Sequence, residues 1–250
     1  MPSKTVTDFT SDTSLILKTF KTLYPNVKES DDLFIIFNAA LNILQLFPQK
    51  TLSDSESSLE NYLKKWAEGY YSFTLPSKRE KSSKATCSDP AIKEMVRAIC
   101  QFSEQEAELE SAIHDLFMAA ENVQGNLLEE YIAERTKEFG WIWCYGETLR
   151  AVDFCSYDGN YLLQIKNKNN TENSSSSAIR IGTTVRKWFR LGSRRVDGEY
   201  VPDFKWDALN EIINSKRKPG VDKLCDMNED DYHDFLNKVM NENPKIIKED

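Results

Sequence analysis

Apolar residues recur three or four positions apart through the first part of the chain, which is the spacing of a buried helix face. Polar stretches separate these runs, and proline or serine residues stand at their ends, where they stop or cap helices. The pattern predicts helices over residues 12–24, over 31–47 before Pro48, and through Leu59 to Trp66 with Ser53 or Ser55 as the cap.

A polar stretch rich in lysine and serine follows at residues 76–88, and we expect it to be an exposed loop. Helix signals resume directly after it, because Asp89-Pro90 combines a capping side chain with a proline suited to a first turn. Further helices are predicted at residues 103–120, opened by a capping box at 103–106, and at 126–139, ended by Gly140.

After Gly140 the pattern changes to aromatic and β-branched residues, which are typical of strands. An Asp-Gly pair at 158–159 separates two of these runs and is a strong hairpin signal. We expect a three-stranded meander, preceded by a helix, formed by residues 141–145, 148–156 and 161–166. Beyond it, helices are predicted at residues 174–190, 204–213 and 230–240.

These elements predict an α/β (α+β) protein with an N-terminal helical region packed on a core. The helical region is expected to span residues 1–110, and the core with its closing helices residues 111–250, within one continuous structural unit. At 250 residues the chain is long enough to bury a sizeable core.

Composition is that of an ordinary globular protein, with 40% hydrophobic and 29% charged residues. No run approaches the roughly 18 apolar residues of a membrane span, and residues 1–10 lack the apolar run of a signal peptide. The five cysteines form no CxxC pair and the two histidines are far apart, which argues against a zinc site. Scattered thiols fit a reducing compartment, so we expect a cytoplasmic protein without membrane contact.

Charge is distributed unevenly along the chain, whose net charge is −8. Residues 160–195 contain eight lysines and arginines against one acid, a local charge of +7 that leaves −15 for the remainder. A phosphate backbone responds to the local field and not to the average, so this segment is a candidate nucleic-acid contact.

A carboxylate, an amide and a lysine are expected to meet at the end of the predicted meander. Period-two alternation places Gln164 and Lys166 on one face of their strand, and Asp153 is one hairpin away. Mg²⁺ takes few protein ligands and prefers oxygen, so Asp153 and Gln164 are candidate ligands.

Such an arrangement supplies what phosphodiester hydrolysis requires. The metal polarises the phosphate and lowers the pKa of a bound water, while Lys166 orients that water or stabilises the developing charge. We therefore predict a Mg²⁺-dependent DNA-cutting enzyme with Asp153, Gln164 and Lys166 as catalytic residues. The competing interpretation is that these are solvated polar residues on an exposed hairpin, and the basic segment that follows favours catalysis.

A second carboxylate is expected from the preceding helix. Leu128 and Ile132 stand four residues apart on its core face, and Glu129 lies beside that face. We predict Glu129 as a further catalytic and metal-binding residue, although a solvated helix acid without such a role is the alternative. Glu147, in a turn, is a weaker candidate.

These residues together resemble the type II restriction endonucleases of the PD-(D/E)xK nuclease superfamily, and within it the SinI-type enzymes. Asp153 and the Gln-Ile-Lys sequence at 164–166 carry the catalytic part of the resemblance. The chain departs from the superfamily pattern at Gln164, where Asp or Glu is usual, so the number of metal ions does not follow from the pattern. The other matching segments are residues 125–129, 166–180, 182–184 and 187–190.

The resemblance implies a PD-(D/E)xK core, with a central mixed β-sheet flanked by helices. It also implies a prokaryotic homodimer that uses Mg²⁺ to cut both strands of double-stranded DNA at a short, GGWCC-like site, leaving 5′-phosphate ends. A restriction system of this kind pairs the nuclease with a DNA methyltransferase that protects host DNA. Two rival functions stay open: a structure-specific repair or recombination nuclease, and a non-catalytic DNA-binding protein.

Short side chains that both donate and accept hydrogen bonds crowd the segment after Lys166, and they suit phosphates and base edges. A helix that begins at the serines would add free backbone N–H groups, whereas a flexible linker is the alternative for the serine run. The predicted DNA-binding residues of this segment are Lys168, Asn169, Asn170, Thr171, Asn173, Ser174, Ser175, Ser176 and Ser177.

Larger basic side chains follow the serines. Arg180 and Arg186 each suit bidentate contact with a guanine. The phosphate backbone is the expected contact of Lys187, Arg190, Arg194 and Arg195. The aromatic pair at 188–189 is expected in the core, because such a pair at helical spacing usually packs.

Overall fold

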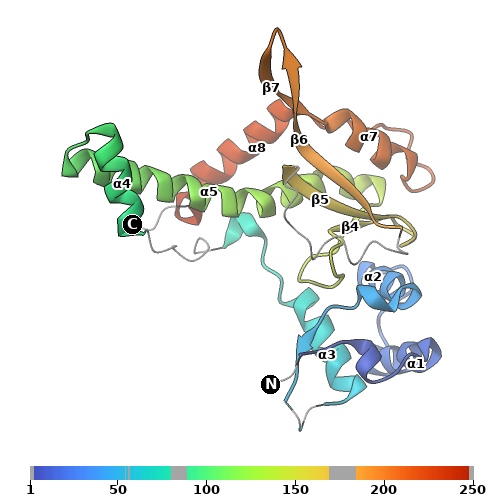
Figure 1. Cartoon of the computed structure of the whole chain (residues 1–250). Helices are drawn as coiled ribbons and strands as arrows, with labels where there is room; N and C mark the ends of the chain where they lie inside the picture. Colours follow the sequence, from blue (N-terminus) through green and yellow to red (C-terminus); the bar gives the residue numbers. More distant parts are fainter. Residues whose placement is uncertain (1–2, 54, 56, 80–88, 169–183, 248–250) are drawn as a thin grey trace. The chain divides into compact units, whose positions relative to one another are not determined.

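The computed structural model describes residues 3–53, 55, 57–79, 89–168 and 184–247 (Figure 1). The chain divides into two compact units: the first contains Met1–Phe73 and Ile132–Glu229, and the second Thr74–Tyr131 and Asp230–Asp250. The units interleave along the sequence, and the boundary expected at residue 110 falls inside the long helix α5, Glu104–Thr136.

Helices form the N-terminal part of the first unit, as the hydrophobic pattern predicts. They are α1 (Thr13–Leu23), α2 (Asp32–Asn42) and α3 (Leu59–Tyr71), accompanied by the 3-10 turns Val6–Asp8 and Leu44–Leu46 and by the short strands β1 (Ser3–Lys4) and β2 (Lys50–Thr51).

The ends of these helices differ in detail from the predictions. The cap of α3 is Ser58, whose hydroxyl accepts from the Asn61 amide at 3.2 Å, so the expected caps Ser53 and Ser55 are wrong. Helix α2 stops five residues earlier than the expected residue 47, because the chain tightens into a 3-10 turn before Pro48.

The core of the first unit joins these helices to the beginning of a sheet. Phe20 and Phe37 stack at a ring-centroid distance of 3.9 Å, and Trp66 packs edge-on against both. The Trp66 indole donates to the Thr148 carbonyl at 2.8 Å, which ties α3 to the segment that leads into the sheet. The same buried cluster includes Ile142, Cys144, Val152, Cys155 and Leu162.

The sheet of the first unit has five strands in the order β3-β4-β5-β6-β7. All neighbours are antiparallel except β5 and β6, which are parallel. This arrangement confirms the expected α+β class with a central mixed sheet, and it confirms the three-stranded meander. The strands are β3 (Ile142–Trp143), β4 (Phe154–Cys155), β5 (Leu162–Lys168), β6 (Arg186–Val196) and β7 (Glu199–Phe204).

The turn between β4 and β5 forms at the predicted Asp-Gly pair. Gly159 has φ of +70°, which favours glycine, and the Asp158 carboxylate accepts from the Asn160 amide at 3.2 Å. A Cβ on Gly159 would also lie 3.2 Å from the Ile35 carbonyl oxygen, so the turn packs closely on α2.

The helix predicted at residues 174–190 is wrong over its last part, because Arg186 onward is strand β6; residues 174–183 lie outside the described residues. Apolar residues at 185, 188 and 189 satisfy a helical period, but burial alternates along the chain instead. Trp188 and Arg190 are buried, whereas their neighbours at 187, 189 and 191 are half-exposed. The segment forms a strand because it pairs with β5 on one side and with β7 on the other.

Strand β7 was not predicted. It forms with β6 a hairpin whose two-residue turn is Asp197-Gly198, with Val196 paired to Glu199. Both turn residues have positive φ, 51° and 92°, as a type I′ turn requires. The Asp-Gly signal was therefore present in the sequence.

Helix α7 (Trp206–Ser215) completes the first unit, and the second unit contains α4 (Pro90–Cys100), most of α5, and α8 (Glu229–Glu242) from residue 230. The helices expected at 204–213 and 230–240 are confirmed. The 3-10 turns are Pro76–Lys78, Lys137–Phe139 and Pro244–Ile246, and Gly140 ends the second of these with φ of +84°.

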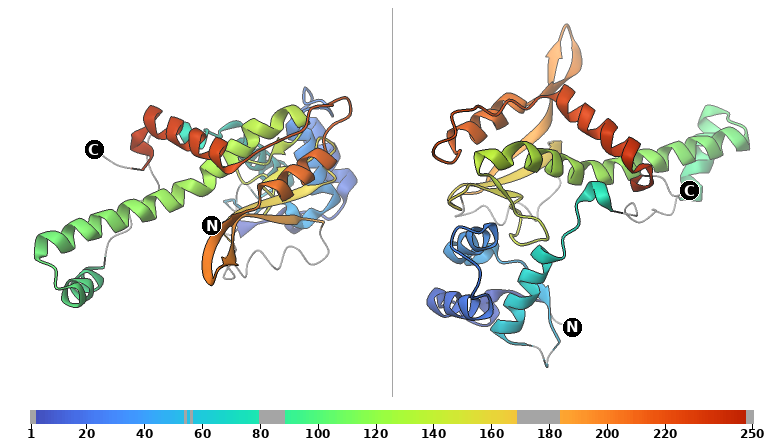
Figure 2. Two further views of the ribbon diagram at one scale, coloured as in Figure 1. Left: turned by 90° about the horizontal axis from the view of Figure 1, so that it is seen from above. Right: turned by 180° about the vertical axis from the view of Figure 1, so that it is seen from behind.

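Two expected helices merge in α5. The capping box at Ser103 and Glu106 is confirmed, with the Ser103 amide donating to the Glu106 carboxylate at 2.8 Å. The helix then continues through Gly125 to Thr136, and both views of Figure 2 show α4 beside its first turns. Among the described residues, no helix combines the length and hydrophobicity that crossing a bilayer requires.

Candidate active site

The pairing of β5 with β6 sorts their side chains onto two faces. Gln164 lies opposite Lys187 and Lys166 opposite Phe189. Partnered residues point to the same side of a sheet, and alternate residues to opposite sides. The face that carries Gln164 and Lys166, which we call the catalytic face, comprises Leu162, Gln164, Lys166 and Lys168 of β5, Lys187, Phe189, Leu191, Ser193 and Arg195 of β6, and Tyr200, Pro202 and Phe204 of β7.

The other side of the same strands is the opposite face. Its residues are Leu163, Ile165 and Asn167 of β5, Arg186, Trp188, Arg190, Gly192, Arg194 and Val196 of β6, and Glu199, Val201 and Asp203 of β7. Ile165 and Trp188 are partners on this face and both are buried, so it forms the packed side of the sheet at that point.

Asp153 immediately precedes β4 and lies at the edge of β5. Its amide donates to the Leu163 carbonyl at 2.9 Å, and its carbonyl accepts from the Cys144 amide at 2.8 Å. Its Oδ2 atom accepts from the Ile165 amide at 2.6 Å. That amide belongs to the peptide bond between Gln164 and Ile165, so the structure brings the Asp153 carboxylate next to the predicted catalytic strand.

The carboxylate takes the place of a backbone acceptor in the sheet. Phe154 and Leu163 are partners, and continuing that register by two residues places Val152 opposite Ile165. A regular ladder would therefore give Ile165 a backbone carbonyl as acceptor, but the Asp153 side chain accepts instead. The β4–β5 ladder ends at this point, and a charged group stands where the pairing stops.

Burial raises the pKa of Asp153 from its ordinary value of 3.8 to about 6. The hydrogen bond from the Ile165 amide and the charge of Lys166 both lower that pKa, but by less than burial raises it. The Gln164 side chain, which carries the second proposed oxygen ligand, is also withdrawn from water, since Gln164 is only 4% exposed. A buried acid that titrates near neutrality is typical of functional sites.

The groups around Asp153 suit a hard divalent cation. The Asp153 carboxylate and the Gln164 amide offer side-chain oxygens, and the Ile165 carbonyl leaves β5 on the same edge as the amide that contacts Asp153. Mg²⁺ keeps several waters and needs few protein ligands. The described residues contain no group of three or more His, Cys, Asp or Glu side chains that could hold a metal, so a cage of side chains like that of structural zinc does not fit there.

Comparison with known proteins adds the family. A family model described as SinI restriction endonuclease matches residues 61–241. The type II restriction enzyme Eco47I of Escherichia coli is 32% identical over 214 residues, covering 82% of this chain and 86% of that enzyme. The type II restriction enzyme SinI of Salmonella infantis is 43% identical over 131 residues, covering 51% of this chain and 50% of SinI.

The chain belongs to the SinI restriction endonuclease family. The resemblance drawn from the sequence is therefore confirmed, and so is the class of enzyme, a type II restriction endonuclease. The span matched by the SinI family model includes Asp153, Gln164, Lys166 and Glu129. Their catalytic roles stay predictions.

Arg190 departs from its expected role as a phosphate contact. Arg190 is 5% exposed and lies on the opposite face. Its Nε donates to Asn167 Oδ1 at 2.9 Å, and its Nη1 pairs with Glu229. Glu229 also accepts from the Trp206 indole at 2.7 Å. Arg190 therefore links β5, β6 and the start of α8 inside the protein. Sequence reasoning missed this network because Glu229 is 39 residues away and carries no local signal.

Other predicted DNA-binding residues are placed only in part. Lys168 is exposed at the end of β5, and Lys187 is half-exposed beside Gln164 on the catalytic face. The Arg186 guanidinium lies 5.9 Å from the centre of the Tyr161 ring. The residues from Asn169 to Arg180 lie outside the described residues, so their contacts stay predictions.

Glu129 lies on the part of α5 that belongs to the second unit, half-buried next to two buried neighbours. Its neighbour Glu130 is 2% exposed and accepts from the Ser77 amide at 2.8 Å and from the Ser77 hydroxyl. The structure thus assigns Glu130 a structural contact. The metal-binding role of Glu129 stays a prediction.

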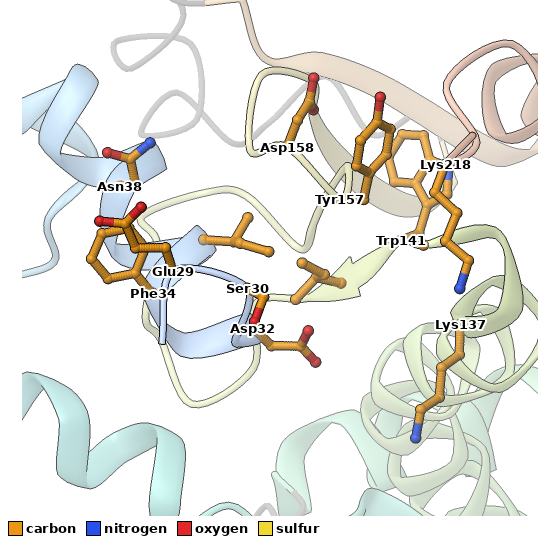
Figure 3. A pocket seen from close by; sticks show the side chains of 13 residues that line it. Glu29, Ser30, Asp32, Phe34, Asn38, Lys137, Trp141, Tyr157, Asp158 and Lys218 are labelled. Atoms are coloured by element: carbon orange, nitrogen blue, oxygen red, sulfur yellow. The ribbon is translucent and has the colours of Figure 1, made fainter. Parts of the chain in front are cut away.

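A separate cavity of about 570 Å³ opens in the first unit between the start of α2 and the segment that precedes β3 (Figure 3). Asp32 and Lys137 both line it, and partial burial raises the pKa of Asp32 while Lys137 lowers it. None of the predicted catalytic residues lines this cavity, so it is separate from the candidate active site.

Proposed function

We propose that this chain is a type II restriction endodeoxyribonuclease that hydrolyses phosphodiester bonds of double-stranded DNA at a short specific site, with Mg²⁺ as cofactor, and leaves 5′-phosphate ends. The observation that carries the proposal is the half-buried Asp153 carboxylate, 2.6 Å from the Ile165 amide between Gln164 and Lys166, in a chain of the SinI family.

The surroundings of Asp153, Gln164 and Lys166 support a role for each. Asp153 and Gln164 would hold the cation. The cation, when bound, supplies Lewis-acid activation of the scissile phosphate. Lys166 shares the catalytic face with Gln164 and is close enough to lower the pKa of Asp153. Its ammonium orients the attacking water and stabilises the charge that develops on the phosphate.

For the substrate we propose a GGWCC-like site, cut on both strands by a homodimer. A DNA methyltransferase that modifies the same site would protect host DNA, and both proteins would work in the cytoplasm of a prokaryote. Membership in the SinI family supports these proposals, and gel mapping of the fragment ends tests the site directly.

The decisive experiment is digestion of a plasmid of known sequence with Mg²⁺, followed by end sequencing. The proposal expects discrete fragments whose ends share one short motif. Lys166→Ala should abolish cleavage while retaining DNA binding, whereas Lys18→Ala, on an exposed face of α1, should cut normally. Cutting limited to flaps or junctions would favour a structure-specific nuclease. Binding without any cleavage by the unaltered chain would favour a non-catalytic DNA-binding protein.

A further inference from the structure

The hairpin of β6 and β7 continues past the rest of the sheet (Figure 1). Pairing of β6 with β5 ends at Leu191, opposite Lys168, whereas pairing of β6 with β7 continues to Val196. Every residue from Ser193 to Tyr200 is exposed. We call residues 192–203 the arm. A two-stranded ribbon that buries so little of itself contributes little to the core, which points to a role outside it.

Strand alternation sorts the charges of the arm. Lys166, Lys168, Lys187 and Arg195 all lie on the catalytic face, and no strand position on that face carries a carboxylate. The acids of β7, Glu199 and Asp203, lie on the opposite face. The catalytic face therefore carries basic side chains from Lys166 to the arm, although the chain as a whole is acidic.

Two residues near the tip of the arm suit contact with a nucleic acid. Tyr200 is 78% exposed and is the cross-strand partner of Arg195, so both project from the catalytic face. Arg195 Nε donates to the Gly198 carbonyl at 3.2 Å, which orients a guanidinium that has further N–H donors. The ring offers a surface for stacking, and the oriented guanidinium offers donors to phosphate or base edges.

We propose that the arm is a DNA-binding element, and that its catalytic-face residues Arg195 and Tyr200 contact the duplex whose scissile phosphate lies at Lys166. This inference rests on the proposed function and adds a binding surface to it. The major groove of B-DNA admits a two-stranded β-ribbon, which matches the form of the arm. Strand β7 is the edge of the sheet, where another protein could add a strand. Pro202 disfavours such pairing, because proline has no N–H group to donate.

The test exploits two adjacent arginines that point to opposite faces. Binding to a fluorescent duplex of about 30 base pairs with one GGACC sequence is measured by anisotropy in EDTA, where no cleavage occurs. Arg195→Ala and Tyr200→Ala should each weaken binding about tenfold, and Arg195→Ala should reduce the salt slope by about one. Arg194→Ala removes the same charge from the opposite face and should weaken binding by no more than about twofold.

Equal losses in Arg194→Ala and Arg195→Ala, or no loss in either, would overturn the arm proposal. Circular dichroism should show unchanged melting for all three variants, since these side chains are exposed. Plasmid cleavage by the unaltered chain separates the two ideas. If that chain cuts and the arm variants bind normally, the arm proposal alone fails; if it does not cut but Arg195→Ala still loses binding, the proposed function alone fails.

Discussion

The two faces of strands β5 and β6 carry basic side chains in different environments. On the opposite face, Arg190 is buried, and its guanidinium is bonded to Asn167 and paired with Glu229. On the catalytic face, Lys166 and Lys187 are half-exposed and border a basic surface. The same residue class therefore holds the protein together on one side of the sheet and faces the proposed substrate on the other.

This difference teaches that charge alone does not identify a DNA contact in the basic segment. Alternation decides it, since each step along a strand reverses the side to which the residue points. Substitutions of the buried residues on the opposite face should lower stability, whereas substitutions of the half-exposed lysines on the catalytic face should lower activity and leave melting unchanged. Four expected outcomes, from the largest to the smallest, test that division.

Trp188→Ala should have the largest effect, on stability. Trp188 is 4% exposed, packs 5.2 Å from Trp206 between ring centres, and donates to the Lys205 carbonyl at 2.9 Å. Removing it should cost about 3–5 kcal/mol in the free energy of unfolding. Urea denaturation measures the loss. Phe189→Ala, the half-exposed neighbour on the catalytic face, is the control and should cost clearly less.

Lys166→Ala should show the reverse pattern. Loss of the ammonium should lower kcat by about 10²–10³-fold, the usual cost of removing one group that stabilises transition-state charge. Its melting temperature should stay within error of the unaltered chain, because the Lys166 side chain is half-exposed. Single-turnover cleavage measures the rate. A variant that cuts at full rate would remove Lys166 from the proposed catalytic set.

Sequence reasoning located the catalytic strand because its signal is local. An Asp-Gly turn and an alternating run with Gln164 and Lys166 define a hairpin without reference to the rest of the chain. It failed at β6, where Trp188 and Phe189 fit two periods and the deciding contacts come from β5 and β7. Arg190 was misassigned for the same reason, since its ion-pair partner Glu229 lies on another element.

The residues of the candidate site could be predicted from the sequence, whereas their electrostatic properties could not. Asp153, Gln164 and Lys166 could be named from spacing, and the structure places Asp153 against the strand that carries the other two. The pKa of Asp153 could not be foreseen, because it depends on burial by residues from several elements. Nor could the charge sorting of the arm, which depends on the β6–β7 register.

Glu229→Gln should lower stability by about 1.5–3 kcal/mol, the usual worth of a hydrogen bond to a charged group. The change leaves Arg190 buried with a neutral partner, although an amide oxygen can still accept from Trp206. Glu138→Gln is the matched control, because Glu138 pairs with Lys223 on the surface and should cost at most about 1 kcal/mol. Equal costs would show that burial does not distinguish the two ion pairs.

The smallest effect should be a pH dependence of stability that originates on the catalytic face. Because the pKa of Asp153 is raised to about 6 in the folded chain, the folded state holds its proton more tightly than the unfolded state. The resulting stability is complete below the unfolded pKa of about 3.9 and is lost as pH rises through about 6.

Asp153→Asn cannot ionise, so in EDTA its stability relative to the unaltered chain should rise between pH 4 and pH 7.5, by an amount on the order of 1–3 kcal/mol. Asp158→Asn is the control, because hydrogen bonds from Ser156 and Asn160 lower the pKa of Asp158 and its relative stability should therefore fall over that range. A relative stability of Asp153→Asn that is flat with pH would mean that the carboxylate is hydrated in the folded chain, and the catalytic face would then lack the buried acid on which the proposed metal site depends.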